Sequence, residues 1–181
     1  MNSIAAKLRN SLPAIITWID RTLMDHADTA TPVSECPFLP LRDHYPKELL
    51  TQSRVVLVPK VPFPPLSRIG LSEFQAMETM MLDGVTYKTT FFVRDGRQSA
   101  SLYFHELVHV TQWARLGAND FLLAYGAGLV QYGYEKSPLE EMAYRLQSGF
   151  DQGRVPLSLV KYIEERTDTV WSAAQTFLLE K

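Results

Sequence analysis

Apolar side chains recur every three or four positions over most of this chain, which is the spacing of amphipathic helices. The first such segment covers residues 4–23, with Pro13 inside it. Further segments cover residues 120–132, 138–148 and 157–179. The pattern therefore predicts a mostly helical protein whose helices pack together through their apolar faces.

The middle of the chain carries the pattern of β-strands. Residues 54–58 form a short run of β-branched and apolar side chains, and residues 85–94 alternate between apolar and polar side chains. Residues 71–82 fit a helix or a strand, and the proline-rich residues 26–53 are expected to be irregular. We therefore expect an α+β fold in which a small twisted sheet lies beside the helices.

Residues 102–114 form the most apolar helical segment, because apolar side chains occupy nearly its whole circumference. Such a helix belongs in the core of a protein. Ser99 or Ser101 can cap its start, and Gly117 can end it. Any charged side chain on this helix must be paired or bound to a metal, since burying a bare charge is costly.

Two histidines and a glutamate on this helix form the pattern His105-Glu106-x-x-His109. Positions i and i+4 share one face of a helix, so that both imidazoles can bind one Zn²⁺. Glu106 can then take a proton from a water molecule that the metal acidifies, which is the chemistry of zinc hydrolases. The alternatives are a metal-free set of hydrogen-bonded side chains or a chance match.

Length and composition exclude several classes of protein. A chain of 181 residues suits one domain, residues 1–181, with a substantial core. The net charge of −2 gives no basic field for nucleic acid or anionic membranes. No apolar run is long enough to span a membrane, and residues 12–19 lack the cleavage site of a signal peptide. We therefore expect a cytoplasmic protein that binds neither nucleic acid nor membrane, while its oligomeric state stays open.

Few other side chains can complete a metal site. Cys36 is the only cysteine, which excludes an internal disulfide, and it is either a buried thiol or a ligand in a latent state. His26 and His44 lack ligand spacing, so we expect both in surface or loop positions. The third ligand should be a carboxylate, and Glu140 is the best candidate, in the first turn of the helix that begins after Ser137. The alternative for Glu140 is a surface acid that stabilises the start of this helix.

The run 104–113, followed by Glu140-x-x-Ala143, resembles the gluzincin group of zinc metallopeptidases. Residues 84–148 as a whole are similar to small bacterial single-domain proteins of this kind, most of them uncharacterised. Residues 1–50, which combine the first helix with the irregular segment, and the last helix lie outside the resemblance.

The resemblance implies a zincin-like fold and a zinc-dependent hydrolysis of peptide bonds. Zn²⁺ would be held by His105, His109 and Glu140, with Glu106 as the general base. The substrate would be a peptide or protein, which could add as a strand to the sheet edge formed by residues 85–94.

This sequence departs from the gluzincin pattern next to the expected third ligand. Met142 stands where a second acid is common, and Tyr144 stands where an aspartate often orients a zinc-bound histidine. Gln112, one turn beyond the second histidine, could orient it instead. Tyr132, Tyr134 and Tyr144 are candidates for stabilising the oxyanion, and core packing is the alternative role for each.

Three functions fit these observations. The first is an active zinc-dependent peptidase. The second is an inactive interaction module that zinc stabilises, which would require a fourth protein ligand. The third is a latent peptidase whose cleft is masked by terminal segments of the chain.

Overall fold

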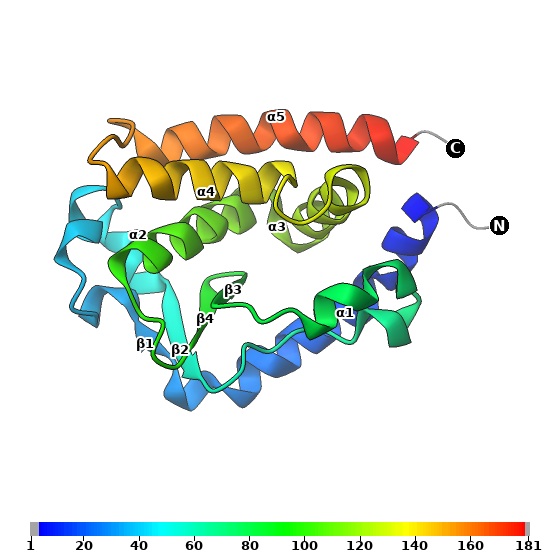
Figure 1. Ribbon diagram of the computed structural model, residues 1–181, viewed down its shortest axis with the longest axis horizontal. Coiled ribbons are helices and arrows are strands. Elements are labelled where there is room, and N and C mark those ends of the chain that lie inside the picture. Colours follow the sequence, from blue (N-terminus) through cyan, green and yellow to red (C-terminus); the bar gives the residue numbers. More distant parts are fainter. Residues whose placement is uncertain (1–3, 180–181) are drawn as a thin grey trace.

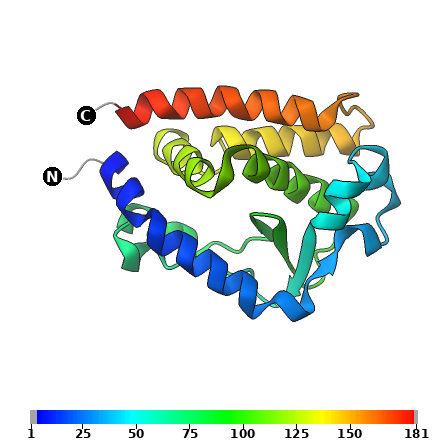
Figure 2. The same ribbon diagram turned by 180° about the vertical axis from the view of Figure 1, so that it is seen from behind.

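Five α-helices form most of the computed structural model, which describes residues 4–179 (Figure 1). They are α1 (Ile4–Asp25), α2 (Lys47–Gln52), α3 (Ala100–Tyr132), α4 (Pro138–Asp151) and α5 (Leu159–Leu179). Helices α3, α4 and α5 pack against one another in one layer, and α1 runs along the opposite side of the molecule (Figures 1 and 2). The helices predicted near both ends of the chain are confirmed, with ends shifted by a few residues.

A small mixed sheet lies between α3 and α1. Its strands are β1 (Thr31–Pro32), β2 (Arg54–Val58), β3 (Gly84–Tyr87) and β4 (Thr90–Arg94), in the order β1-β2-β4-β3. Strands β2 and β4 are parallel, whereas the other two pairs are antiparallel. Strand β3 is therefore at one edge of the sheet.

The prediction of a single strand over residues 85–94 is wrong, because the chain reverses at Lys88 and Thr89 to form the β3–β4 hairpin. Lys88 has a φ of 58°, a conformation that a lysine seldom adopts and that its sequence does not signal. Side chains still alternate between the two faces of the sheet in β4, but Phe91 and Val93 lie on the opposite face from Tyr87. Tyr87 thus packs beside Phe92 rather than Phe91, with ring centroids 6.0 Å apart.

The core divides into two clusters, one on each face of β4. Phe92 packs into the cluster that includes Ile15 and Ile19 of α1, whereas Phe91 and Val93 pack into the cluster under α3 and α4. These three β4 side chains have no exposed surface. Strand β4 therefore packs against both the α1 side and the α3 side of the molecule.

Helix α3 begins where the sequence predicts but continues past Gly117, where it was predicted to end. The Ser99 hydroxyl accepts a hydrogen bond from the Leu102 N–H at 3.1 Å and caps the helix. Gly117 has a non-helical conformation (φ 72°, ψ 173°), so that α3 is kinked there rather than ended. The kink separates the helical segment that carries His105 and His109 from the segment that leads to α4.

The segment between β2 and β3 lies against α1. It contains two 3₁₀ helices, Leu66–Ile69 and Ser72–Thr79, so residues 71–82 form neither a strand nor an α-helix. The Ser11 hydroxyl of α1 donates a hydrogen bond to the Ile69 carbonyl at 2.9 Å, and Lys7 forms an ion pair with Glu73. These contacts attach α1 to the segment.

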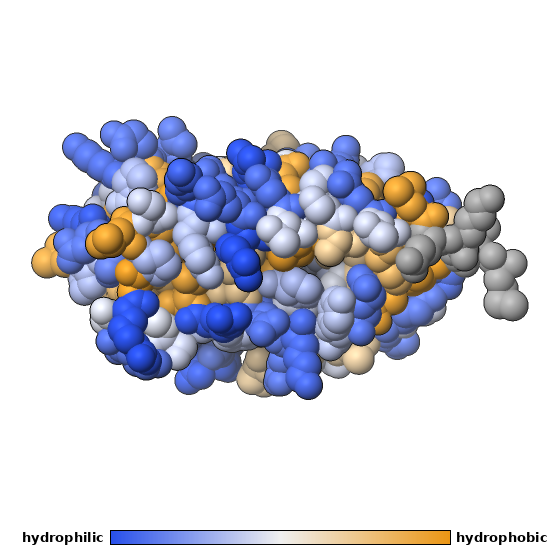
Figure 3. Space-filling view, turned by 90° about the horizontal axis from the view of Figure 1, so that it is seen from above, coloured by the Kyte–Doolittle hydropathy of each residue, from blue (hydrophilic) through white to orange (hydrophobic). Residues whose placement is uncertain are grey.

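The chain is thus an α+β protein, a single mostly helical domain with a small sheet, as the sequence predicts. None of the helices in residues 4–179 is long and apolar enough to cross a membrane. Figure 3 views the molecule from the side of α5 and shows hydrophilic side chains over most of this face, with apolar groups between them. This distribution agrees with the burial of only one side of α5, which is lined by Leu159, Ile163, Thr167, Ala174 and Leu178.

Candidate metal centre

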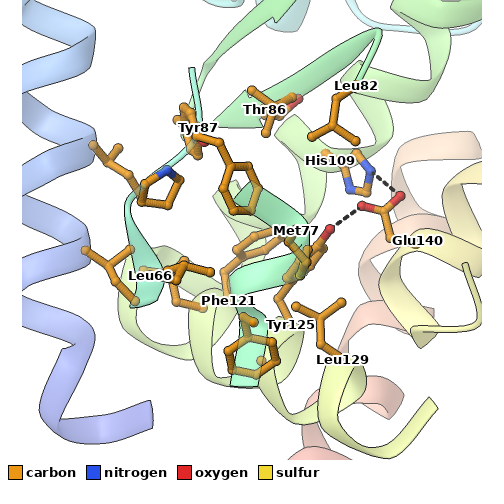
Figure 4. Close-up of a pocket in the computed structure, with 18 of the residues that line it drawn as sticks. Leu66, Met77, Leu82, Thr86, Tyr87, His109, Phe121, Tyr125, Leu129 and Glu140 are labelled. Atoms are coloured by element: carbon orange, nitrogen blue, oxygen red, sulfur yellow. Dashed lines mark hydrogen bonds and ion pairs between the residues drawn. The ribbon is translucent and has the colours of Figure 1, made fainter. Parts of the chain in front are cut away.

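Helix α3 presents His105 and His109 on one buried face, and the two Nε2 atoms lie 3.1 Å apart. Glu140, in the first turn of α4, directs its Oε2 atom to within 3.5 Å of the His105 Nε2 and 3.4 Å of the His109 Nε2. All three residues are 4–5% exposed. The predicted ligands therefore meet in the interior of the protein, where Figure 4 shows His109 and Glu140 pointing towards each other.

Close contact between α3 and α4 brings Glu140 to the histidines. Ala143, one turn after Glu140, is fully buried and small. A Cβ atom on Gly128 would lie 2.6 Å from the Ser137 Oγ, so only glycine lets α3 approach the start of α4 this closely. Ser137 precedes α4 as expected, but its hydroxyl makes no capping hydrogen bond.

A glutamine determines which nitrogen of His109 carries the proton. The Gln112 side-chain N–H donates to the Leu139 carbonyl at 3.1 Å, which leaves the Gln112 Oε1 as an acceptor. This oxygen lies 2.8 Å from the His109 Nδ1, so the neutral imidazole has its proton on Nδ1. The Nε2 lone pair of His109 then points towards Glu140.

His105 is oriented through a longer series of hydrogen bonds. The Ser101 hydroxyl donates to the Asp151 carboxylate at 2.9 Å and accepts from the Gln147 side-chain N–H at 2.9 Å. The Gln147 Oε1 is therefore the acceptor for the His105 Nδ1, at 3.0 Å. When the two imidazoles are neutral, both thus keep their Nε2 lone pairs for the space between them.

This arrangement of lone pairs requires a cation. In the neutral rings neither Nε2 can donate, and the buried Glu140 Oε2 has no hydrogen-bond partner among residues 4–179. Three unpaired acceptors in a buried site are costly unless a proton or a metal ion lies between them. His105, His109 and Glu140 therefore form a group that could hold a metal ion.

The charges of the site reflect the same requirement. Burial opposes protonation of His109, but the Glu140 carboxylate outweighs this effect and raises the pKa of His109 to about 9. Burial alone would raise the pKa of Glu140, but the two imidazoles hold it well below its usual range. Glu140 is consequently ionised and attracts a positive charge to the centre.

No known protein family, no curated protein and no solved structure matches this chain.

Glu106 lies beside the metal centre and is held by β3. Its Oε2 atom accepts a hydrogen bond from the Thr86 hydroxyl at 2.7 Å, and the side chain is 2% exposed. A Cβ atom on Gly84 would lie 2.2 Å from the Glu106 Oε1, so this carboxylate occupies the space that the glycine leaves. Burial raises the pKa of Glu106, although the neighbouring histidines oppose the shift.

The tyrosines near the centre are placed differently from one another. Tyr144 packs on His105, with ring centroids 4.7 Å apart, and Tyr134 lines the pocket beside the centre. Tyr132 is 55% exposed and does not line this pocket. Tyr125, which the sequence indicates only as an apolar contact, donates its hydroxyl proton to the Glu140 Oε1 at 2.5 Å (Figure 4).

Cys36, His26 and His44 do not join the metal-binding group. The Cys36 thiol lies 3.8 Å from the Pro32 carbonyl. The His26 Nδ1 bonds the carbonyl of Thr22 at 2.8 Å, and the His44 ring makes edge contacts with Phe104 and Phe150. Among residues 4–179, no other His, Cys, Asp or Glu joins the group of His105, His109 and Glu140.

The centre opens into a pocket of about 110 Å³. His105, Glu106, His109 and Glu140 form its polar end. Most of the remaining lining is apolar and comes from α1, from residues 63–82, from β3 and from α3. A metal ion at the centre would therefore face a water-poor space in which electrostatic interactions are strong.

Proposed function

We propose that this protein is a zinc-dependent peptidase of gluzincin type with a zincin-like fold. His105, His109 and Glu140 are the metal ligands, and Glu106 is the general base. The observation that carries the proposal is the convergence of two imidazole Nε2 atoms and one carboxylate oxygen at one buried point.

The donor set favours zinc. Two imidazole nitrogens and one carboxylate oxygen are a common ligand set of catalytic zinc, whereas calcium and magnesium prefer oxygen ligands alone. When bound, zinc supplies a Lewis acid that polarises a carbonyl group and acidifies water. Ionised Glu140 and Glu106 together balance the double positive charge, so the buried site is neutral when loaded.

Glu106 has the properties of a general base. Burial raises its pKa towards the range in which a carboxylate can take up a proton and release it again near neutral pH. Thr86 holds one carboxylate oxygen, so the other oxygen, beside Gly84, is the one that exchanges the proton. The hydrogen bond to Thr86 keeps the carboxylate fixed during this transfer.

Strand β3 and Tyr134 are the proposed contacts for a peptide or protein substrate. As an edge strand, β3 can accept a further strand through main-chain hydrogen bonds. Trp113 already donates to the Thr86 carbonyl at 3.1 Å, which leaves the Gly84 end of β3 for the substrate. Tyr134 lines the pocket and is the proposed donor to the oxyanion.

Replacement of the base tests the proposed reaction. Glu106→Gln should keep about one zinc per chain and lose at least 100-fold of the peptide-cleaving activity, because the amide cannot accept the proton. Zinc is measured by elemental analysis, and cleavage of a peptide mixture by mass spectrometry. Glu141→Gln, an exposed neighbour of the third ligand, is the matched control and should retain both.

Undiminished cleavage by Glu106→Gln would contradict the role of Glu106. If the wild-type protein held zinc but cleaved no peptide, the function would instead be that of an inactive module.

A latent peptidase is the second candidate, because α1 closes one end of the pocket. Ion pairs of Lys7 with Glu73 and of Lys88 with Asp20 hold α1 in this position. The double substitution Lys7→Ala and Lys88→Ala should therefore raise peptide cleavage if α1 masks the cleft. Unchanged cleavage would show that α1 is a permanent wall of the pocket.

A further inference from the structure

The pocket beside the metal centre has a polar end and an apolar end. The polar groups are the metal-site side chains with Tyr125 and Tyr134, and they lie together. The opposite end is formed by aliphatic and aromatic side chains of α1 and of the segment before β3. Figure 4 shows this separation, with Glu140 and His109 on one side and Leu66 near α1 on the other. A ligand that fills the pocket must therefore carry its polar group next to the metal.

The apolar side chains at the two ends of the pocket differ in burial. Leu82, Val85 and Leu129 at the metal end are only partly buried. Leu8, Ile15 and Ile19 of α1, which line the other end, are 4%, 7% and 1% exposed. Side chains of α1 thus close the end of the pocket opposite the metal centre, and partly buried side chains lie at the metal end.

The wall that α1 forms is well supported. A Cβ atom on Gly126 would lie 2.7 Å from the Leu8 Cδ2, so the leucine side chain fills the notch above this glycine of α3. The Ser11 hydrogen bond to the Ile69 carbonyl fixes the next turn of α1. The depth of the pocket is therefore set by the α1 side chains that line it.

The size of the pocket limits what it can hold. An apolar cavity of about 150 Å³ holds a benzene molecule. The pocket found here, at about 110 Å³, is smaller than that cavity. Because a cavity of about 150 Å³ holds the six carbons of benzene, a space of about 110 Å³ suits about four carbon groups by proportion. That is the size of an aliphatic side chain such as leucine, and much less than a long acyl chain.

We propose that this pocket binds an aliphatic side chain of the peptide substrate, next to the bond that is cleaved, and that Leu8, Ile15 and Ile19 set its length. The inference rests on the proposed peptidase function for the identity of the substrate. The pocket itself can be probed without catalysis.

Straight-chain hydroxamic acids test the proposal, because the hydroxamate binds zinc and the alkyl tail can enter the pocket. Affinities of compounds with one to eight tail carbons are measured by calorimetry on the protein loaded with one equivalent of zinc. Affinity should rise about fourfold for each added methylene up to about four carbons, and then level off or fall. An affinity independent of tail length, or one that still rises at eight carbons, would overturn the proposal.

Two substitutions at Ile15 should move this limit in opposite directions. Ile15→Ala removes three carbons from the α1 end of the pocket, so that the tail length with the highest affinity becomes longer. Ile15→Phe fills this end, so that the optimum shifts to shorter tails while the one-carbon compound binds unchanged. Thr17→Phe adds the same ring to the exposed face of α1 and should leave the series unchanged. General destabilisation cannot produce opposite shifts, and the same optimum in both Ile15 variants would exclude α1 as the end of the pocket.

Straight-chain alcohols, which do not bind the metal strongly, separate this proposal from the proposed function. Their affinities should follow the same tail-length limit and the same response to Ile15 substitution. If the alcohols show the tail-length limit but zinc does not raise the affinity of the hydroxamates, the side-chain pocket is supported and the proposed zinc site is refuted. If the hydroxamates bind zinc but neither series depends on Ile15, the metal site stands and the side-chain pocket is refuted.

Discussion

Gln112 and Gln147 determine what the two histidines offer to a metal. Each glutamine uses its N–H group elsewhere, and its oxygen therefore accepts the proton of an imidazole Nδ1. Neutral amides orient the rings without adding negative charge, which leaves charge balance to Glu106 and Glu140. Such partners of metal ligands commonly contribute 10- to 100-fold to metal affinity.

Removing these amides should weaken metal binding without unfolding the protein. We expect Gln112→Ala and Gln147→Ala each to lower zinc affinity at least 10-fold, because the rings lose their orientation. Competition with a fluorescent chelator measures the affinity. Gln152→Ala removes an exposed glutamine of the same region and should have no effect. Equal affinities in all these variants would refute the orienting role.

The proton on His109 should compete with the metal. In the metal-free protein the pKa of His109 is raised to about 9, above its usual value of 6.5, so this ring is charged at neutral pH. Its ion pair with Glu140 therefore stabilises the metal-free fold fully below about pH 6.5, and this stabilisation is lost as the pH rises through 9. Zinc must displace that proton, so zinc affinity should increase from pH 7 to pH 9.

Calorimetry in two buffers of different ionisation enthalpy measures the proton released. We expect close to one proton per zinc at pH 7.5. Zinc binding without proton release at this pH would contradict the charged state of His109.

Residue spacing predicted part of this site and missed the rest for physical reasons. The i, i+4 rule places His105 and His109 together, and a helix start places Glu140. Tyr125 could not be anticipated, because the kink at Gly117 changes the direction of α3 before it. Gln147 lies two turns after Glu140 on the same face of α4. This spacing could have predicted that Gln147 contacts one of the histidines.

At the scale of whole elements, glycines decide how closely backbone and side chains approach the centre. Gly128 admits the start of α4, and Gly84 makes room for Glu106 next to β3. The sequence indicated the strands but not the β3–β4 turn. Neither Lys88 nor Thr89 is a residue type that favours two-residue turns. One strand was consequently predicted over residues 85–94, where the chain forms two.

Gly84→Ala should separate metal binding from catalysis. The added Cβ atom would overlap the Glu106 carboxylate and displace it, whereas the three metal ligands are untouched. We expect unchanged zinc content, at least 10-fold lower peptide cleavage and a loss of about 1–3 kcal/mol in the free energy of unfolding from overpacking. Elemental analysis, a cleavage assay and urea unfolding measure the three quantities. Full activity in a variant with the lower stability would place the base elsewhere.

For the whole molecule, the centre joins two helices of the upper layer, and the pocket lies between that layer and α1. The apolar periodicity predicted the α+β class and most helices, since burial dictates one face of each. It could not predict that α1 and residues 63–82 meet over the pocket. That contact joins segments far apart in the sequence through side chains that look like ordinary core residues.

Because the ligands belong to α3 and α4, a bound metal should stabilise the fold. At a zinc concentration 1,000 times the dissociation constant, the expected stabilisation is about 4 kcal/mol. A chelator should therefore lower the melting temperature of the wild-type protein but not that of His105→Ala, which lacks one ligand. Equal effects of the chelator on both proteins would mean that the metal binds elsewhere.

Anomalous X-ray diffraction at the zinc absorption edge, from crystals of the zinc-loaded protein, shows directly whether His105, His109 and Glu140 hold zinc. We expect one anomalous peak, at about 2.0–2.2 Å from the His105 Nε2, the His109 Nε2 and the Glu140 Oε2. A peak at any other place, or no peak between these three side chains at full zinc loading, would contradict this expectation.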